Sequence, residues 1–232
     1  MDYRFGAVLA LIGVSIAFQL AAPEGDGARL VTVLLQAATL VAAVTASRAH
    51  QWVLMAAWTV AVLGSIGALA AVIGTEKFDA PGASSVTLLL VALAPPAIAN
   101  GVRKQFQRDG RVTIQTMAGA LCLYLLIGLL FSTTYATADA FSDRDFFLAQ
   151  GAVESDDYLY FSFVTLTTTG YGDLVAATEL GRSLAITEAL FGQIYLVTVV
   201  ALVVGNLRPA GRDAAPDRSA GGSRGAARGV ER

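Results

Sequence analysis

Residues 165–173 read Thr-Leu-Thr-Thr-Thr-Gly-Tyr-Gly-Asp, so two glycines flank a single tyrosine. Glycine readily adopts positive φ, and alternating glycines therefore allow successive carbonyl oxygens to face the same side of the chain. A row of carbonyl oxygens is a set of hard ligands without formal charge. Such ligands replace the hydration shell of a monovalent cation and still release the ion. The chemistry predicted for this stretch is reversible cation binding, without a covalent reaction.

The composition indicates that this stretch belongs to a membrane protein. Of the 232 residues, 55% are hydrophobic and 15% are charged, whereas an average soluble domain has roughly 45–50% and about 25%. This balance argues against a soluble enzyme. The formal net charge of −2 and the lack of basic stripes argue against nucleic-acid binding. One cysteine and one histidine provide neither an internal disulfide nor zinc-ligand spacing.

Apolar runs of about 18 or more residues are typical of membrane-spanning helices. Six segments are predicted to cross the bilayer: 5–22, 30–47, 52–74, 86–102, 112–135 and 183–205. The fourth is the weakest because Pro95 and Pro96 interrupt it, although neighbouring helices can cover a proline kink. The first could also be a signal peptide. Its apolar run exceeds the usual h-region of about 7–15 residues, which favours a retained helix.

The apolar run 158–167 lies between the fifth and sixth predicted spans and is too short to cross the bilayer. It is therefore predicted to be re-entrant. Irregular backbone at membrane depth is tolerated only where it is buried in protein or lines an aqueous cavity. The predicted fold is an all-α membrane protein with six transmembrane helices, and with a re-entrant helix and the ion-binding segment between helices five and six.

The positions of the basic residues predict that both termini are cytoplasmic. With six crossings, twelve of the 16 Lys and Arg residues fall on that side, and the remaining four fall outside. Without the weak fourth span, the basic residues of 103–111 would move to the outside, so the same count supports that span. Residues 207–232 are rich in Gly, Ala and Arg and are predicted to form a disordered cytoplasmic tail, with no cytosolic ligand domain evident.

The stretch 165–173 resembles the selectivity filter of potassium channels, whose pattern is Thr-x-x-Thr-x-Gly-Tyr-Gly-Asp. All six fixed positions match, at Thr165, Thr168, Gly170, Tyr171, Gly172 and Asp173. Segment 112–135 resembles the outer pore helix, 157–167 the pore helix, and the segment from 181 onward the inner helix. The resemblance covers about residues 112–206. It implies a potassium channel of the plasma membrane, with K⁺ as the permeant ion, no cofactor and no enzymatic activity.

The resemblance also implies which atoms bind the ion. The carbonyl oxygens of Thr168, Thr169, Gly170 and Tyr171, together with the Thr168 hydroxyl, are expected to form four stacked K⁺ sites. Gly172 is expected to add the outermost carbonyl. Thr169 stands where valine or isoleucine is more frequent, but its backbone ligand is unchanged, so potassium selectivity is expected to be retained.

Filter support is expected from Tyr160, Thr165 and Asp173. Asp173 is expected to bond back to the pore helix, where Tyr160 has a hydroxyl to donate and Phe161 has none. Some bacterial members carry a glutamate at the position of Val164. An acid-linked filter gate of that kind is therefore not expected here.

One pore loop per chain implies a homotetramer, because a closed ring of carbonyl oxygens needs four strands. Acidic residues around the loop are expected either to concentrate cations at the pore mouth or to be ordinary solvated charges. They are Asp139, Asp143, Asp145, Glu154, Asp156, Asp157 and Glu179.

Glu188 is the only charged residue inside a predicted span. Ionisable residues within membranes are often functional, which suggests a site that responds to pH or attracts cations. The alternative, which we favour, is a structural glutamate bonded to a pore-helix hydroxyl such as that of Ser162 or Thr165.

Four further residues of the last span are candidates for gating or for lining the pore. Gly192 lies twenty residues after Gly172, where this family often has a hinge glycine, but glycines also occur at close helix contacts in membranes. Gln193, Leu196 and Val200 recur at helical spacing, and they either line the cavity or face a neighbouring subunit.

Voltage sensing is not expected, because it requires several arginines at every third position of the fourth helix. That helix has none between residues 86 and 99. The chain is therefore divided into a non-voltage-sensing four-helix bundle (1–111), a pore domain (112–206) and the tail (207–232). The predicted function is potassium-selective conduction. The alternatives are a weakly selective cation channel and a non-conducting regulatory pore subunit.

Overall fold

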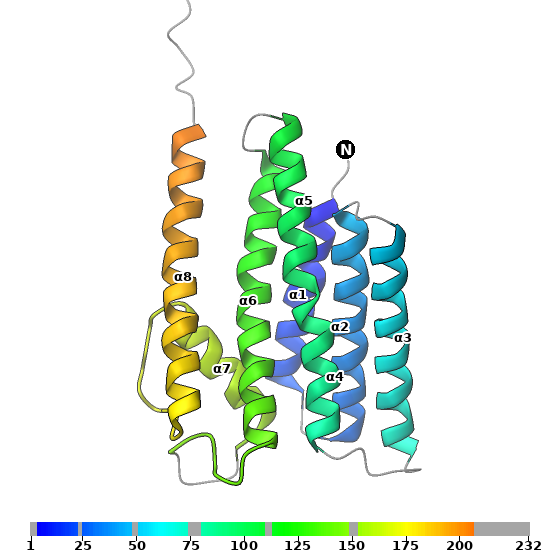
Figure 1. Ribbon diagram of the computed structural model, residues 1–232, viewed down its shortest axis with the longest axis vertical. Coiled ribbons are helices and arrows are strands. Elements are labelled where there is room, and N and C mark those ends of the chain that lie inside the picture. The colour runs from blue at the N-terminus through cyan, green and yellow to red at the C-terminus, as the bar shows by residue number, and fades with distance from the viewer. Residues whose placement is uncertain are drawn as a thin grey trace, which may run out of the picture.

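The computed structural model describes residues 4–22, 25–47, 51–73, 80–109, 113–148 and 153–206, and the predicted tail 207–232 lies outside them. Within these ranges the regular secondary structure is helical, apart from an isolated β-bridge between Phe147 and Ala176 (Figure 1). The helices are α1 (Arg4–Ala21), α2 (Asp26–Ala46), α3 (Gln51–Ile73), α4 (Ala80–Ala92), α5 (Ala94–Asp109), α6 (Ile114–Ala140), α7 (Ser155–Leu166) and α8 (Glu179–Asn206).

Four helical segments of the described ranges are long and apolar enough to cross a membrane: Gly27–Ala46, Ser84–Gln107, Ile114–Ala140 and Glu179–Leu202. They correspond to the second, fourth, fifth and sixth predicted spans. The first and third predicted spans contain shorter apolar helices, at Phe5–Ala21 and Val53–Leu69. The all-helical fold with apolar spans agrees with the prediction, while the number of six crossings stays a prediction.

The proline pair divides the fourth span without ending it. Helix α4 ends at Ala92 and α5 begins at Ala94, so Pro95 and Pro96 lie in the first turn of α5. Proline is well tolerated there because the first N–H groups of a helix have no intrahelical partner. The two helices follow each other end to end (Figure 1) and together form one apolar segment.

Helix α6 is longer than the predicted fifth span, since it continues to Ala140 instead of ending at residue 135. The sequence becomes polar there, but threonine hydroxyls bond to carbonyl oxygens of the preceding turn. Thr134 donates to Leu130 and Thr137 donates to Thr133, each at 2.7 Å. These bonds satisfy the hydroxyls within the helix, so the polar side chains are compatible with the helical conformation.

Helix α6 joins the N-terminal helices to α7 and α8. It lies between α8 on one side and α1 to α5 on the other (Figure 1). One buried apolar cluster extends from the N-terminal helices through α6 to α7 and includes Ile12, Leu40, Leu90, Ile98, Leu126 and Leu159. The first residues of α1 and the end of α8 lie at the same end of the bundle, opposite the loop after α6.

Candidate ion-binding segment

Helix α7 leads directly into the candidate segment. At its start, the Asp157 side chain accepts a hydrogen bond from the Glu154 N–H at 3.0 Å, and acidic residues in the first turn complement the helix dipole. Its 12 residues make about 18 Å of helix, well short of the roughly 30 Å hydrocarbon core. Its last carbonyl oxygens lie next to segment 168–172 and accept hydrogen bonds from it.

The backbone of segment 168–172 alternates between two conformations. Thr168 has φ 56°, Gly170 has φ 55° and Gly172 has φ 81°, and among the described residues these are the ones with φ in the left-handed region. The alternation turns successive peptide planes so that their carbonyl oxygens can point the same way. Thr168 is β-branched, and holding it at positive φ costs on the order of 1–3 kcal/mol, a strain that is typical of functional sites.

The N–H groups of this segment bond back to the end of α7. The Thr168 N–H donates to the Thr165 carbonyl at 2.9 Å, and the N–H groups of Thr169 and Gly170 donate to the Val164 carbonyl at 2.9 and 3.3 Å. The first three donors of the segment are thus engaged by α7, which leaves their carbonyl oxygens as the backbone groups that can face an ion. Thr165, which is predicted to support the segment, contacts it through its main-chain carbonyl oxygen.

A hydrogen bond from Tyr160 to Asp173 ties the outer end of the segment to α7. The hydroxyl donates to the Asp173 carboxylate at 2.6 Å, as the sequence predicts for this pair. Phe161, the neighbouring aromatic residue, is buried in an aromatic cluster instead. The hydrogen bond lowers the pKa of Asp173, and the same bond raises the pKa of Tyr160 to about 12.

We predict that Tyr160→Phe lowers the thermal stability of the purified protein at neutral pH. Because the pKa of Asp173 is lowered, the bond contributes fully to folding stability when the pH is above the ordinary carboxyl pKa of about 3.9. This contribution to stability is lost as the pH falls through the lowered pKa of Asp173. The stability difference between the two proteins should therefore be largest at neutral pH and shrink in acid, as measured by thermal unfolding at several pH values.

Tyr124→Phe is the matched control for this prediction, because the Tyr124 hydroxyl bonds to the Leu166 carbonyl, which does not titrate. Its effect on stability should not change between neutral and acidic pH. A Tyr160→Phe effect that is equally independent of pH would contradict the assigned partner.

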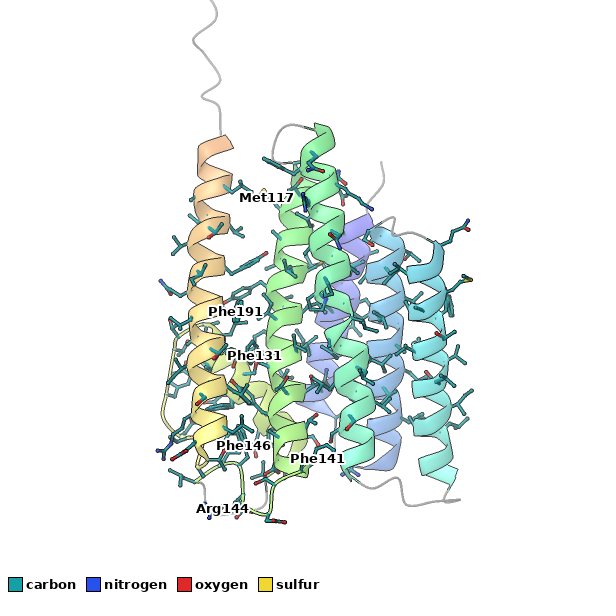
Figure 2. All side chains as sticks on the ribbon, in the orientation of Figure 1. Met117, Phe131, Phe141, Arg144, Phe146 and Phe191 are labelled. Atoms are coloured by element: carbon teal, nitrogen blue, oxygen red, sulfur yellow. The ribbon has the colours of Figure 1, made fainter. Side chains whose placement is uncertain are left out.

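An aromatic cluster joins α6, α7 and the loop after α6. Tyr135, Phe146, Phe147, Tyr158 and Phe161 are all buried in it, with the rings of Tyr135 and Phe161 only 5.1 Å apart. Figure 2 shows Phe146 at the level of the loops between α6 and α8. The loop after α6 also pairs with the chain that follows the segment, because the Ala177 N–H donates to the Phe146 carbonyl at 2.7 Å.

Asp139, one of the acidic residues expected near the pore mouth, has a packing role instead of a solvated one. Its carboxylate accepts a hydrogen bond from the Tyr158 hydroxyl at 2.5 Å and one from the Phe146 N–H at 2.9 Å. Since α6 extends to residue 140, Asp139 lies on its last turn and connects that helix to α7. The side chain of Asp157 likewise has a structural contact, because it accepts a hydrogen bond from the Glu154 N–H at the start of α7.

The five gating candidates on α8 differ in burial. Glu188 and Gly192 are buried. Gln193, Leu196 and Val200 are exposed, Leu196 to 51% and Val200 to 53%. Between α6 and α8, Phe131 and Phe191 face each other with ring centroids 6.4 Å apart (Figure 2).

Gly192 lies at a very close helix contact. A Cβ atom added at this position would lie 2.2 Å from the carbonyl oxygen of Leu166, at the end of α7. The absence of a side chain therefore allows α8 to pack against the end of the short helix. Of the two explanations considered for this glycine, the structure provides direct geometric support for close packing.

The carboxyl group of Glu188 is fully buried and bonds to two hydroxyls. Tyr135 on α6 is 2.5 Å from Oε2, and Ser162 on α7 is 2.5 Å from Oε1. Of the two pore-helix hydroxyls expected to serve Glu188, Ser162 makes the contact. Tyr135 was not predicted, and no sequence pattern relates it to Glu188, which is 53 residues away.

Comparison with known proteins places this region among channels. Residues 121–208 match a protein family described as "Ion channel". The "Two pore potassium channel a" of Oryza sativa subsp. japonica is 33% identical over 111 residues, which are 47% of this chain and 28% of the rice protein. The "Probable potassium channel protein 2" of Methanocaldococcus jannaschii is 44% identical over 55 residues, 21% of this chain and 16% of the archaeal protein.

The matched stretches thus span less than a third of the length of either curated relative. No solved structure matches this chain significantly.

Proposed function

The chain is a member of the potassium channel family, and we propose that it forms a potassium-selective channel that conducts K⁺ passively through segment 168–172. The family consists of ion channels rather than enzymes, and it uses no cofactor, K⁺ being the permeant ion. The observation that carries the proposal is the alternating positive φ at Thr168, Gly170 and Gly172, in a segment whose N–H groups bond back to α7.

In this proposal the carbonyl oxygens provide the K⁺ ligands. The four stacked K⁺ sites are formed by the Thr168 hydroxyl and by the carbonyl oxygens of Thr168, Thr169, Gly170 and Tyr171. The carbonyl oxygen of Gly172 is the outermost one. Uncharged oxygens suit a monovalent cation, which must bind strongly enough to enter and weakly enough to leave. The dipole of α7 helps, since the negative end of a helix dipole lies at its C-terminus, next to the segment.

The proposed assembly is a homotetramer in the lipid bilayer. Within one chain the segment lacks partners across the ion path, and the Tyr171 side chain is 72% exposed. Helix α8 also presents a broad exposed apolar face that includes Leu190, Ile194, Leu196, Val197 and Val200. Neighbouring subunits would cover Tyr171 and this face, with Gln193, Leu196 and Val200 at the subunit contact or in the cavity.

The proposed topology has six crossings in the plasma membrane and cytoplasmic termini. It is supported by the distribution of basic residues, and by the position of the start of α1 and the end of α8 at one end of the bundle (Figure 1). Residues 1–111 form the peripheral bundle in this scheme, and residues 112–206 form the pore domain.

The test is ion flux through the purified full chain in lipid vesicles, with K⁺ and Na⁺ gradients compared and empty vesicles as the control. We expect K⁺ flux and a reversal potential that follows the K⁺ gradient. A reversal potential that follows both ions equally would indicate the weakly selective cation channel. A stable tetramer without flux would indicate the regulatory pore subunit, and either result would overturn the proposal.

A further inference from the structure

Three helices meet at the carboxyl group of Glu188. The side chain belongs to α8 and has 0% exposure within a single chain. Its Oε2 lies 2.5 Å from the hydroxyl of Tyr135 on α6, and its Oε1 lies 2.5 Å from the hydroxyl of Ser162 on α7. The Ser162 hydroxyl is also 2.7 Å from the carbonyl oxygen of Gly128 on α6. These four groups form one continuous chain of short polar contacts.

Each of these three contacts needs one proton to be a hydrogen bond, and the two hydroxyls together supply only two. A carbonyl oxygen only accepts, so the contact to Gly128 requires the single proton of the Ser162 hydroxyl. The contact between Ser162 and Glu188 then needs a proton from Oε1. Tyr135 donates its own proton to Oε2. The chain is fully satisfied only when the Glu188 carboxyl is protonated.

The surroundings of the carboxyl group provide no positive charge to balance an ionised form. Among the described residues, α6 contributes the phenol groups of Tyr135 and, farther away, Tyr124, while α7 contributes the Ser162 hydroxyl. Arg182, on the same helix as Glu188, donates to the Ala176 carbonyl. An isolated buried carboxylate is strongly unfavourable, so the neutral acid fits this site.

We infer that Glu188 is a neutral carboxylic acid that donates to Ser162 and acts as a positioning residue, holding α7 against α6 and α8. Segment 168–172 bonds to the last turn of α7, so the position of α7 determines the position of the carbonyl oxygens. Loss of the proton would break one contact and place a negative charge among buried groups. The effect on conduction rests on the proposed function, whereas the protonation state does not.

Infrared spectroscopy of the purified full chain tests the protonation state directly. We expect the carbonyl stretching band of a neutral carboxylic acid at neutral pH, and its loss in Glu188→Gln. The matched control is Glu179→Gln, because Glu179 lies on the same helix but is exposed, and this variant should keep the band. If the band is missing at neutral pH, or if Glu188→Gln does not change it, the inference is overturned.

Tyr135→Phe provides a second variant if Glu188→Gln does not fold. It keeps the acid and removes the hydrogen bond to Oε2, so the band should shift and persist. An unchanged band would show that the signal comes from another group, and would also overturn the inference.

The pH dependence of the protein tests the positioning role. At alkaline pH we expect the wild type to lose thermal stability, and its K⁺ flux to fall several-fold. Glu188→Gln should retain both, because its amide donates to Ser162 and cannot ionise. An identical pH profile in the two proteins would contradict the role. Stability and the infrared band are measured without ion flux, so they decide this inference even if the chain does not conduct.

Discussion

Replacing Gly170 by alanine is expected to abolish K⁺ flux while leaving the helical content unchanged. Gly170 has φ +55°, and an added Cβ atom would meet nothing within 4 Å, so the effect comes from the backbone and not from a clash. A residue with a side chain costs roughly 1–2 kcal/mol in this left-handed conformation. Four copies around one ion path raise this to roughly 4–8 kcal/mol in total. Because about 1.4 kcal/mol corresponds to a tenfold change, the lower of these totals corresponds to a loss of at least several hundred-fold, and we expect no detectable flux in vesicles.

Gly13→Ala is the matched control for Gly170→Ala. Gly13 lies in α1, also has nothing within 4 Å of an added Cβ atom, and has no positive φ. Alanine is favoured over glycine in a helix by roughly 1 kcal/mol, so this variant should conduct like the wild type. Wild-type flux in Gly170→Ala would contradict the proposed role of the segment.

Gly192→Ala is expected to destabilise the folded protein strongly. The added Cβ atom would lie 2.2 Å from the Leu166 carbonyl oxygen and 3.0 Å from Leu166 Cδ1. The first of these is a backbone atom that cannot rotate away, so α8 must move relative to α7. Overpacking of this kind costs roughly 1–3 kcal/mol and occasionally more. Thermal unfolding of the purified protein measures the loss.

Gly205→Ala is the control in the same helix, since an added Cβ atom there meets nothing within 4 Å. It should unfold at the wild-type temperature or above it. The comparison also separates the two explanations of Gly192. A residue needed only as a hinge would leave stability unchanged in Gly192→Ala and alter channel opening alone, which would contradict the packing explanation.

Most helices of the described ranges could be predicted from the sequence, because each long apolar run has to bury its backbone polar groups internally. The predicted helix boundaries were least accurate where polar side chains or prolines occur near a helix end. Helix α6 continues beyond the predicted end at residue 135, with threonine hydroxyls bonded to carbonyl oxygens of the preceding turn. Pro95 and Pro96 fall in the first turn of a helix, where the missing N–H groups have no effect. Both outcomes depend on local hydrogen bonding, which hydropathy alone does not describe.

In the candidate site, the Tyr160–Asp173 hydrogen bond was expected from the resemblance to potassium channels, which implies an aromatic partner for Asp173 on the pore helix. Tyr160 could be chosen because it has a hydroxyl and Phe161 does not. The partners of Glu188 could be predicted only in part. Its hydrogen bond to Ser162 was one of two alternatives, while the hydrogen bond from Tyr135 depends on how α6 packs against α8. Asp139 could not be distinguished from the solvated acidic residues until its contacts with Tyr158 and Phe146 were seen.

The sequence by itself determined that the chain is a helical membrane protein with one segment whose carbonyl oxygens can face the same side, because hydrophobicity and glycine spacing act through the local backbone. Only the tertiary structure decided which residues of α8 are buried and which hydroxyls form hydrogen bonds with Glu188. It also showed that α8 packs against the end of α7 at residue 192, where a side chain would not fit. These features depend on distances between helices that are far apart in the sequence. A residue type sets what a side chain can donate or accept, whereas packing sets which group it meets.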